Sequence, residues 1–268
     1  FTGGEPLLRE DIMDLIKYAR GLGFKDVQLV TNGTLLGQRI PELKEVGLDL
    51  LTVSLDAINA DVYEYMRGHA IAPVLDAIKR CSEVGIAVRI NMIVIKSNFD
   101  QLKPMIEFAR NTNCSLKLLD LIRLPGIEEF WEKEYLNFNE VRKLLDEMGG
   151  VYIGKEEAPG GIGAPLSEYR TKDGCQIVIK DSTQGTFYHE TCNDCKNYPC
   201  QDALISVRVT HDGNLKRCLI RNDNLVDLRT VMKSNDTQAV IDTLRETFTI
   251  MTESKYEPFK WIPPVVSI

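Results

Sequence analysis

The sequence predicts an α/β protein with a parallel sheet, followed by a smaller cysteine-rich α+β part. Two observations support this prediction. Apolar strand-like segments alternate with helical patterns in the first half, and cysteines crowd into the last third. We place the boundary near residue 125, so that 1–125 and 126–268 form two domains. At 268 residues, with 44% hydrophobic and 26% charged residues, the composition is that of an ordinary globular protein.

The first half alternates strands and helices. Segments rich in Val, Ile and Leu predict strands buried on both faces at 27–33, 50–57, 88–96 and 114–123. Helical patterns lie between them at 9–22, 35–46, 59–67 joined to 71–84, and 98–112. Several end in a glycine, which favours helix termination. Strand–helix–strand units of roughly 25–35 residues imply right-handed crossovers and a parallel sheet.

The second half loses this rhythm. LPGIEEFWEKEYLNF (124–138) has the composition of a linker, and EEAPGGIGAP (156–165) that of a loop. Helices are expected at 138–148 and 236–251, and short strands at 175–181, 204–213 and 215–220. HDGN (211–214) predicts a hairpin turn between the last two strands.

Charge and hydropathy exclude several classes. The formal net charge of −7 argues against a basic nucleic-acid-binding or membrane-surface protein. No apolar run reaches the roughly 18–20 residues that a membrane span needs. We therefore expect a cytoplasmic protein with a small-molecule substrate, and neither a membrane nor a nucleic acid as partner.

Polar residues stand at the ends of the predicted strands, in TGGEP (2–6), TNGT (31–34), SLDA (54–57) and RIN (89–91). The carboxyl ends of parallel strands share one rim, where ligands bind. Gly3 and Gly4 lack Cβ atoms and let the backbone approach a ligand, and Glu5 offers an acceptor to an ammonium group. The alternative is that the GG and NG pairs are simply turns.

The motifs GGEP, TNGTLL, VSLDA and YEYMRGH, in this order, resemble the radical S-adenosylmethionine (SAM) superfamily, in the branch that contains the GTP 3′,8-cyclases. The resemblance implies a partial (βα)6, TIM-like barrel that holds a 4Fe-4S cluster beside SAM. In this family a 5′-deoxyadenosyl radical takes a hydrogen atom from the substrate. The cluster is held by a CxxxCxxC motif after the first strand, which we expect, with that strand, upstream of Phe1.

The resemblance also implies roles for individual residues. SAM is expected to contact Gly3, Gly4 and Glu5 through its amino group, and Thr31, Asn32 and Ser54 through its ribose and carboxylate. Arg67 and Arg89 are expected to point into the barrel mouth and to contact a phosphate or carboxylate. A surface salt bridge is the alternative for both arginines. Asp56 is as readily explained as a helix cap.

The last third carries a compact group of cysteines. CNDCKNYPC gives Cys192-x2-Cys195-x4-Cys200, and Cys218 follows in LKRCLI. Thiolates are the ligands that iron–sulfur clusters and zinc prefer, so structural zinc competes with a cluster. The resemblance implies an auxiliary Fe-S cluster, which in this family is a 4Fe-4S cluster held by three cysteines with one iron open to the substrate. The other cysteines, Cys81, Cys114 and Cys175, are expected to be structural, with Cys175 as a spare ligand.

The cysteine region departs from the cyclase pattern. That pattern is CxxC, thirteen residues and Cys, with Asn-Arg-x-Arg after the second Cys. Here Leu204 stands at the place of the second Cys, Ser206 at that of the first arginine, and Arg208 keeps the second. Four thiolates would close the cluster, and the chain ends in WIPPVVSI instead of the cyclase's double-glycine tail.

The sequence therefore predicts a radical SAM enzyme, most specifically a GTP 3′,8-cyclase of molybdenum cofactor synthesis or a paralogue that acts on another nucleotide. Arg67, Arg89 and Arg208 would hold its phosphate, and flavodoxin or ferredoxin would supply electrons. One alternative is a peptide-modifying radical SAM enzyme with a fully ligated auxiliary cluster. Another is a zinc-stabilised, non-catalytic relic, which requires that no CxxxCxxC motif lies upstream.

Overall fold

The computed structural model describes residues 1–156, 166–202, 204 and 206–257. Its contacts divide the chain into two compact units. Unit 1 comprises residues 1–121, 134–154 and 168–179, and unit 2 comprises 122–133, 155–167 and 180–268. The chain first crosses between them at the place predicted, near residue 125, and later returns to unit 1. That 1–125 and 126–268 are separate domains stays a prediction.

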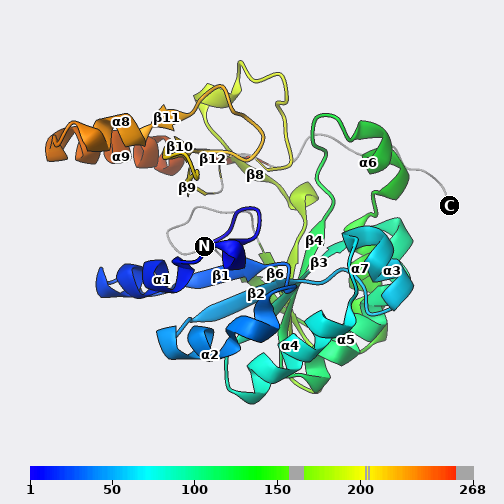
Figure 1. Cartoon of the computed structure of the whole chain (residues 1–268). Coiled ribbons are helices and arrows are strands. Elements are labelled where there is room, and N and C mark those ends of the chain that lie inside the picture. Colours follow the sequence, from blue (N-terminus) through cyan, green and yellow to red (C-terminus); the bar gives the residue numbers. More distant parts are fainter. Residues whose placement is uncertain (157–165, 203, 205, 258–268) are drawn as a thin grey trace. The chain divides into compact units, whose positions relative to one another are not determined.

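Unit 1 is an α/β structure built on a mostly parallel sheet. The seven strands run in the order β1 (Gln28–Thr31), β2 (Leu50–Ser54), β3 (Val88–Val94), β4 (Ser115–Asp120), β7 (Gln176–Lys180), β6 (Leu166–Arg170) and β5 (Val151–Glu156). Strands β1 to β4 pair in parallel, as the alternating pattern predicted (Figure 1). The four predicted strands of the first half are thus confirmed, each somewhat shorter than expected.

Helices connect these strands and cover the core. They are α1 (Ile12–Gly21), α2 (Leu36–Val46), α3 (Ala60–Arg67), α4 (Ala72–Glu83), α5 (Leu102–Asn111) after the 3-10 turn η2 (Lys96–Gln101), and α7 (Phe138–Glu147). Asn59 caps α3 by accepting the N–H groups of Asp61 and Val62 at 3.0 and 3.1 Å. Gly68 ends it at φ 74°, a left-handed conformation that glycine adopts without strain.

Unit 2 contains short strands, turns and helices. Its elements are α6 (Glu128–Glu134, which enters unit 1 at its last residue), β8 (Thr186–Tyr188), η4 (Glu190–Cys192), β9 (Arg208–Val209), β10 (Asn214–Lys216), β11 (Val226–Asp227), α8 (Leu228–Lys233), α9 (Thr237–Thr252) and β12 (Lys255–Glu257). The small sheets have the orders β11-β10-β9 and β12-β8, and all their pairs are antiparallel. The hairpin predicted at 211–214 is confirmed, and so is the helix predicted at 236–251.

Some expectations for the second half were wrong. The passage predicted to be a linker contains α6, whose Trp131 is buried. The prediction missed this short helix because the Pro125–Gly126 pair before it is typical of a loop. The strand expected at 204–213 is reduced to β9, and Leu204 instead packs in a small core with Cys218 and Met251. Most of the loop predicted at 156–165, and the tail at 261–268, lie outside the described residues. Within the described part of the chain, no helix has the length and apolarity to cross a membrane.

Candidate functional site

Glu5 lies at the centre of a hydrogen-bond network at the carboxyl end of β1. Its Oε1 accepts the Thr31 hydroxyl at 2.7 Å and the Leu7 N–H at 3.1 Å, and its Oε2 accepts the Asn32 N–H at 2.7 Å. An ionised carboxylate has about four acceptor positions, so one remains for a ligand donor. The structure thus brings together three predicted SAM-binding residues: Glu5, Thr31 and Asn32.

The two glycines before Glu5 border open space. A Cβ atom added to Gly3 or Gly4 would meet nothing within 4 Å. Gly3 also has φ +141°, which L side chains rarely adopt. The backbone at both positions therefore borders open space on this side, and the approach of a ligand there stays a prediction.

One face of the parallel sheet is polar. Ser54 lies opposite Asn91 and Thr52 opposite Arg89 in the β2–β3 register, and Asn91 lies opposite Lys117 on β4. Register partners in a parallel pair point to the same side of the sheet. The alternate residues of β3, among them Ile90 and Met92, are fully buried and belong to the hydrophobic core. The sheet therefore buries one face in the core and keeps hydroxyl, amide and cationic groups on the other.

Two groups on this polar face are buried without a partner. Among the described residues, Nε of Arg89 and Oδ1 of Asn91 have no hydrogen bond. A buried polar group left unsatisfied costs about 1–3 kcal/mol, and a polar ligand would remove that cost. With the Glu5 carboxylate and Ser54, these groups fit the ammonium, carboxylate and ribose hydroxyls of SAM. Asn91 was absent from the predicted site, and RIN (89–91), expected at a strand end, lies in the first half of β3.

Arg67 makes an ion pair within unit 1. Its Nε donates to Oδ2 of Asp56 at 2.5 Å, and a terminal nitrogen contacts the same oxygen. Asp56 is 3% exposed, and its Oδ1 accepts the Ile93 N–H at 2.9 Å. Burial raises the pKa of Asp56, while Arg67 and then this N–H oppose the rise. Asp56 therefore holds Arg67 at the end of α3 instead of capping the helix, a role that Asn59 takes.

Arg208 lies in unit 2, on β9. It stands opposite Lys216 in the antiparallel pair with β10, so the two cationic side chains share one face of the small sheet. In the described part of the chain, its Nη1 is buried and has no hydrogen-bond partner. This donor is available to an anion, as the substrate prediction for Arg208 requires.

The four cysteines of the C-terminal group line one small cavity. Cys192, Cys195, Cys200 and Cys218 surround a space of about 20 Å³, together with Arg221 and Asn224. The Arg221 N–H points to Sγ of Cys218 at 3.4 Å. Burial raises the pKa of Cys192, and Cys218 and Cys195 add to the rise. The predicted metal ligands therefore converge, although they come from separate stretches of the chain.

The spacing of these thiols bears on the metal. No three His, Cys, Asp or Glu side chains of the described residues are arranged to hold a single metal ion. A mononuclear zinc site needs its thiolates close together, each with a Zn–S distance of about 2.3 Å. An iron–sulfur cluster is larger than one ion and holds its thiolates further apart. The four thiols of the cavity are the ligand type that both an iron–sulfur cluster and zinc take.

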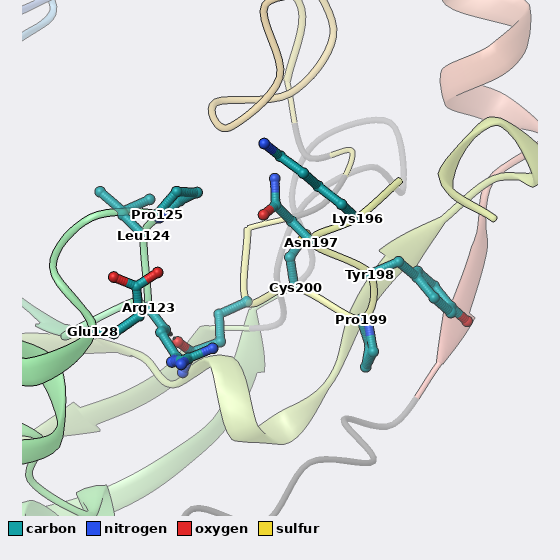
Figure 2. A pocket seen from close by; sticks show the side chains of 10 residues that line it. Arg123, Leu124, Pro125, Glu128, Lys196, Asn197, Tyr198, Pro199 and Cys200 are labelled. Carbon is teal, nitrogen blue, oxygen red and sulfur yellow. Dashed lines mark hydrogen bonds between the residues drawn. The ribbon is translucent and has the colours of Figure 1, made fainter. Parts of the chain in front are cut away.

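A larger cavity of about 260 Å³ lies beside the cysteines, within unit 2 (Figure 2). In Figure 2 the segment 123–128 borders one side and the segment 196–200 the other. Arg123 and Lys196 contribute positive charge, Glu128 contributes negative charge, and Cys200 lines the space as well. Sequence reasoning missed this cavity because its residues lie some 70 positions apart and form no motif.

Comparison with known proteins identifies the class. A sequence model described as the radical SAM superfamily matches residues 1–109. These residues carry the Glu5 network and most of the polar sheet face. The fold and this match define a radical SAM enzyme, a class that uses SAM and a 4Fe-4S cluster.

Curated relatives narrow the family. A probable GTP 3′,8-cyclase of Methanothermobacter thermautotrophicus is 31% identical over 254 residues, covering 92% of this chain and 75% of the relative. The GTP 3′,8-cyclase of Limosilactobacillus fermentum is 30% identical, covering 84% of this chain and 64% of the relative. Streptococcus suis SuiB superposes with a TM-score of 0.49 at 20% identity, over 55% of this chain and 34% of that one, too slight a likeness to support an argument. The chain belongs to the GTP 3′,8-cyclase branch of the radical SAM superfamily.

Proposed function

We propose that the polar sheet face and the Glu5 network bind SAM. Gly3, Gly4 and Glu5 would meet its amino group, and Thr31, Asn32 and Ser54 its ribose and carboxylate. The observation that carries this proposal is the Glu5 carboxylate, which three donors hold at 2.7 to 3.1 Å while one acceptor position stays available. When bound, SAM and its 4Fe-4S cluster supply a 5′-deoxyadenosyl radical for hydrogen abstraction.

The parallel strands β1 to β4 would form part of a partial (βα)6 barrel that opens at their carboxyl ends. In such a barrel the buried donor of Arg89 and acceptor of Asn91 would face the ligand. They would orient it by hydrogen bonds while the apolar side of the sheet fixes the strands. Asn91 lies opposite Ser54, the last residue of β2, and this position supports binding toward the carboxyl ends of the strands, where α/β folds place their ligands.

The substrate that the relatives favour is GTP. Arg67, Arg89 and Arg208 would then contact its phosphates, with Arg208 offering a buried, unsatisfied donor. For Arg67 the contact would use only the guanidinium edge that Asp56 leaves available. Cys192, Cys195, Cys200 and Cys218 would hold an auxiliary cluster, and a flavodoxin or ferredoxin in the cytoplasm would supply electrons. The extra thiolate keeps a peptide-modifying radical SAM enzyme as the second candidate.

The experiment is an anaerobic assay of the full-length gene product with SAM, dithionite and GTP. We expect 5′-deoxyadenosine and a cyclised GTP product in equal amounts. ATP serves as the matched control nucleotide and should give no product. Formation of 5′-deoxyadenosine with GTP left unaltered would reject the cyclase and favour the peptide-modifying enzyme. Complete absence of SAM cleavage by protein loaded with iron and sulfide would reject the radical SAM reaction itself.

A further inference from the structure

The segment that carries three of the four cysteines is wound into successive turns. The Cys195 N–H donates to the Cys192 carbonyl at 3.0 Å, and the Tyr198 N–H donates to the Cys195 carbonyl at 2.9 Å. These turns place Cys192 and Cys195 on the same small cavity. The loop is therefore held in shape by its own backbone.

Two further contacts fix Cys200 beside Cys218. The buried Tyr188 donates its hydroxyl to the Cys200 carbonyl at 2.5 Å. Asp202, which is 2% exposed, accepts the Leu219 N–H at 3.0 Å. Because Asp202 lies two residues after Cys200 and Leu219 directly follows Cys218, this hydrogen bond joins the two cysteine-bearing segments.

We propose that Cys192, Cys195, Cys200 and Cys218 all ligate the auxiliary 4Fe-4S cluster, so that no iron is left open to a substrate. A 4Fe-4S cluster is completed by four thiolates, and four converge here. The inference rests on the proposed function only in that the site holds a cluster. In the family that the sequence resembles, three cysteines hold this cluster; here the fourth thiolate, which the sequence also predicted as a ligand, would close it.

Cys200 is the ligand that closes the site toward the larger cavity. Of the four cysteines, it alone also lines the space between Arg123 and Lys196 (Figure 2). An anionic ligand held there by these cations would meet the side of the cluster that Cys200 covers. The cavity would then bind its ligand through Arg123 and Lys196, without an iron–ligand bond.

The test uses the 268-residue chain, reconstituted with iron and sulfide without oxygen and reduced with dithionite. We expect about four irons per chain. The electron paramagnetic resonance spectrum should show no hyperfine coupling to added ¹⁵N-imidazole. Cys200→Ala should keep its cluster and gain this coupling, because one iron loses its thiolate. Cys175→Ala, outside the cavity, is the matched control and should behave like the unchanged chain.

Thiol alkylation of the unchanged chain provides a measurement that needs no variant. With the cluster loaded, iodoacetamide should spare all four cysteines, and removal of the cluster should expose the half-buried Cys200. Imidazole coupling in the unchanged chain, alkylation of Cys200 while the cluster is loaded, or zinc without sulfide would overturn the proposal. None of these measurements depends on SAM cleavage. A failure of the proposed function would appear in the assay with SAM and GTP and would leave these results unchanged.

Discussion

The hydroxyl of Thr31 donates to Oε1 of Glu5 over 2.7 Å and joins the end of β1 to the turn that contains the two glycines. The same hydroxyl accepts the Gly33 N–H at 3.0 Å. Thr31 is 2% exposed; its bond to Gly33 is buried and its bond to Glu5 is partly buried. The strand end and the ligand-facing turn are therefore fixed by one network.

Glu5→Gln tests this network. Glutamine would place an NH2 group where one carboxylate oxygen now accepts a backbone N–H, leaving a partly buried donor unsatisfied. We expect a loss of about 1–3 kcal/mol in the free energy of unfolding, measured with urea. In the full-length protein we also expect at least about a tenfold lower rate of 5′-deoxyadenosine formation. Glu10→Gln, at an exposed position, is the control, and equal behaviour of the two variants would contradict the role of Glu5.

The buried pair Asp56–Arg67 provides a second test. Removing one partner of a buried ion pair leaves the other charge without compensation, which is strongly destabilising. Since the Arg67 side chain is 28% exposed, we expect Asp56→Asn to cost about 2–3 kcal/mol, below the fully buried case. A double-mutant cycle with Arg67→Met should give a coupling free energy showing that the two side chains stabilise each other.

The control pair for this cycle is Asp76–Arg80 on α4, at 3.6 Å and largely exposed. Its coupling should be about 0.5 kcal/mol or less. Coupling in the Asp56–Arg67 cycle no larger than this would show that solvent screens the pair. A raised KM for GTP in Arg67→Met with unchanged stability would instead favour the predicted substrate contact.

Much of unit 1 was predictable because its signals are local. LLTVS holds three consecutive buried residues, as a strand buried on both faces requires. VRINMIV alternates buried and half-buried residues, so the prediction that this strand is buried on both faces was wrong, although the strand itself was located. Glycines such as Gly47, which ends α2 at φ 65°, mark helix ends by the backbone conformation that they allow. The TNGT motif located Thr31 because that residue ends β1. The strand expected before GGEP is not among the described elements, and Glu5 instead caps the 3-10 helix Pro6–Leu8.

The remainder depends on contacts that a single sequence does not reveal. Short strands such as β8 and β12 form only through pairing over some 70 positions. The ion pair between Asp56 and Arg67 joins the residues after β2 to the end of α3. Nothing in the sequence around either residue identifies the other as its partner. Similarly, the motif spacing identified Cys192 and Cys195 as ligands, whereas the link from Asp202 to Leu219 that brings Cys200 toward Cys218 is a tertiary contact.

A pH dependence is expected from Asp49, which connects α1 to the start of β1. The Val27 N–H at 2.7 Å, and then the Arg20 guanidinium at 2.5 Å, hold the pKa of Asp49 below its ordinary 3.8. The unfolded chain then binds more protons than the folded chain between the two pKa values. The stabilisation by Asp49 is therefore present above pH 3.8 and lost as pH falls through the lowered pKa.

Asp49→Asn measures this contribution. At pH 7 the variant should unfold at a lower temperature than the unchanged chain, and the difference should shrink as pH falls below about 4. Thermal unfolding at a series of pH values checks the sign. A difference that grows on acidification would contradict the assignment.

The buried thiols of unit 1 should be chemically inert. Burial, with a smaller effect of Cys114, raises the pKa of Cys81 to about 12 and that of Cys175 to about 11. At pH 8 their thiolate fractions are then about one in ten thousand and one in a thousand. Iodoacetamide labelling, mapped by mass spectrometry, should find both at least about a hundredfold slower than in urea-unfolded chain. Rapid labelling in the folded chain would show that this core opens.

Arg208 allows the substrate proposal to be tested at one atom. Its buried Nη1 lacks a partner among the described residues, so a phosphate oxygen would gain a charge-assisted hydrogen bond at little structural cost. Arg208→Met keeps the aliphatic stem and removes the donors. We expect the KM for GTP to rise about 10- to 100-fold, since such bonds contribute about 1.5–3 kcal/mol, while kcat changes little. Arg245→Met, on the exposed face of α9, is the matched control. An unchanged KM would remove Arg208 from the substrate site, whereas a fall in kcat alone would place it in the chemical step.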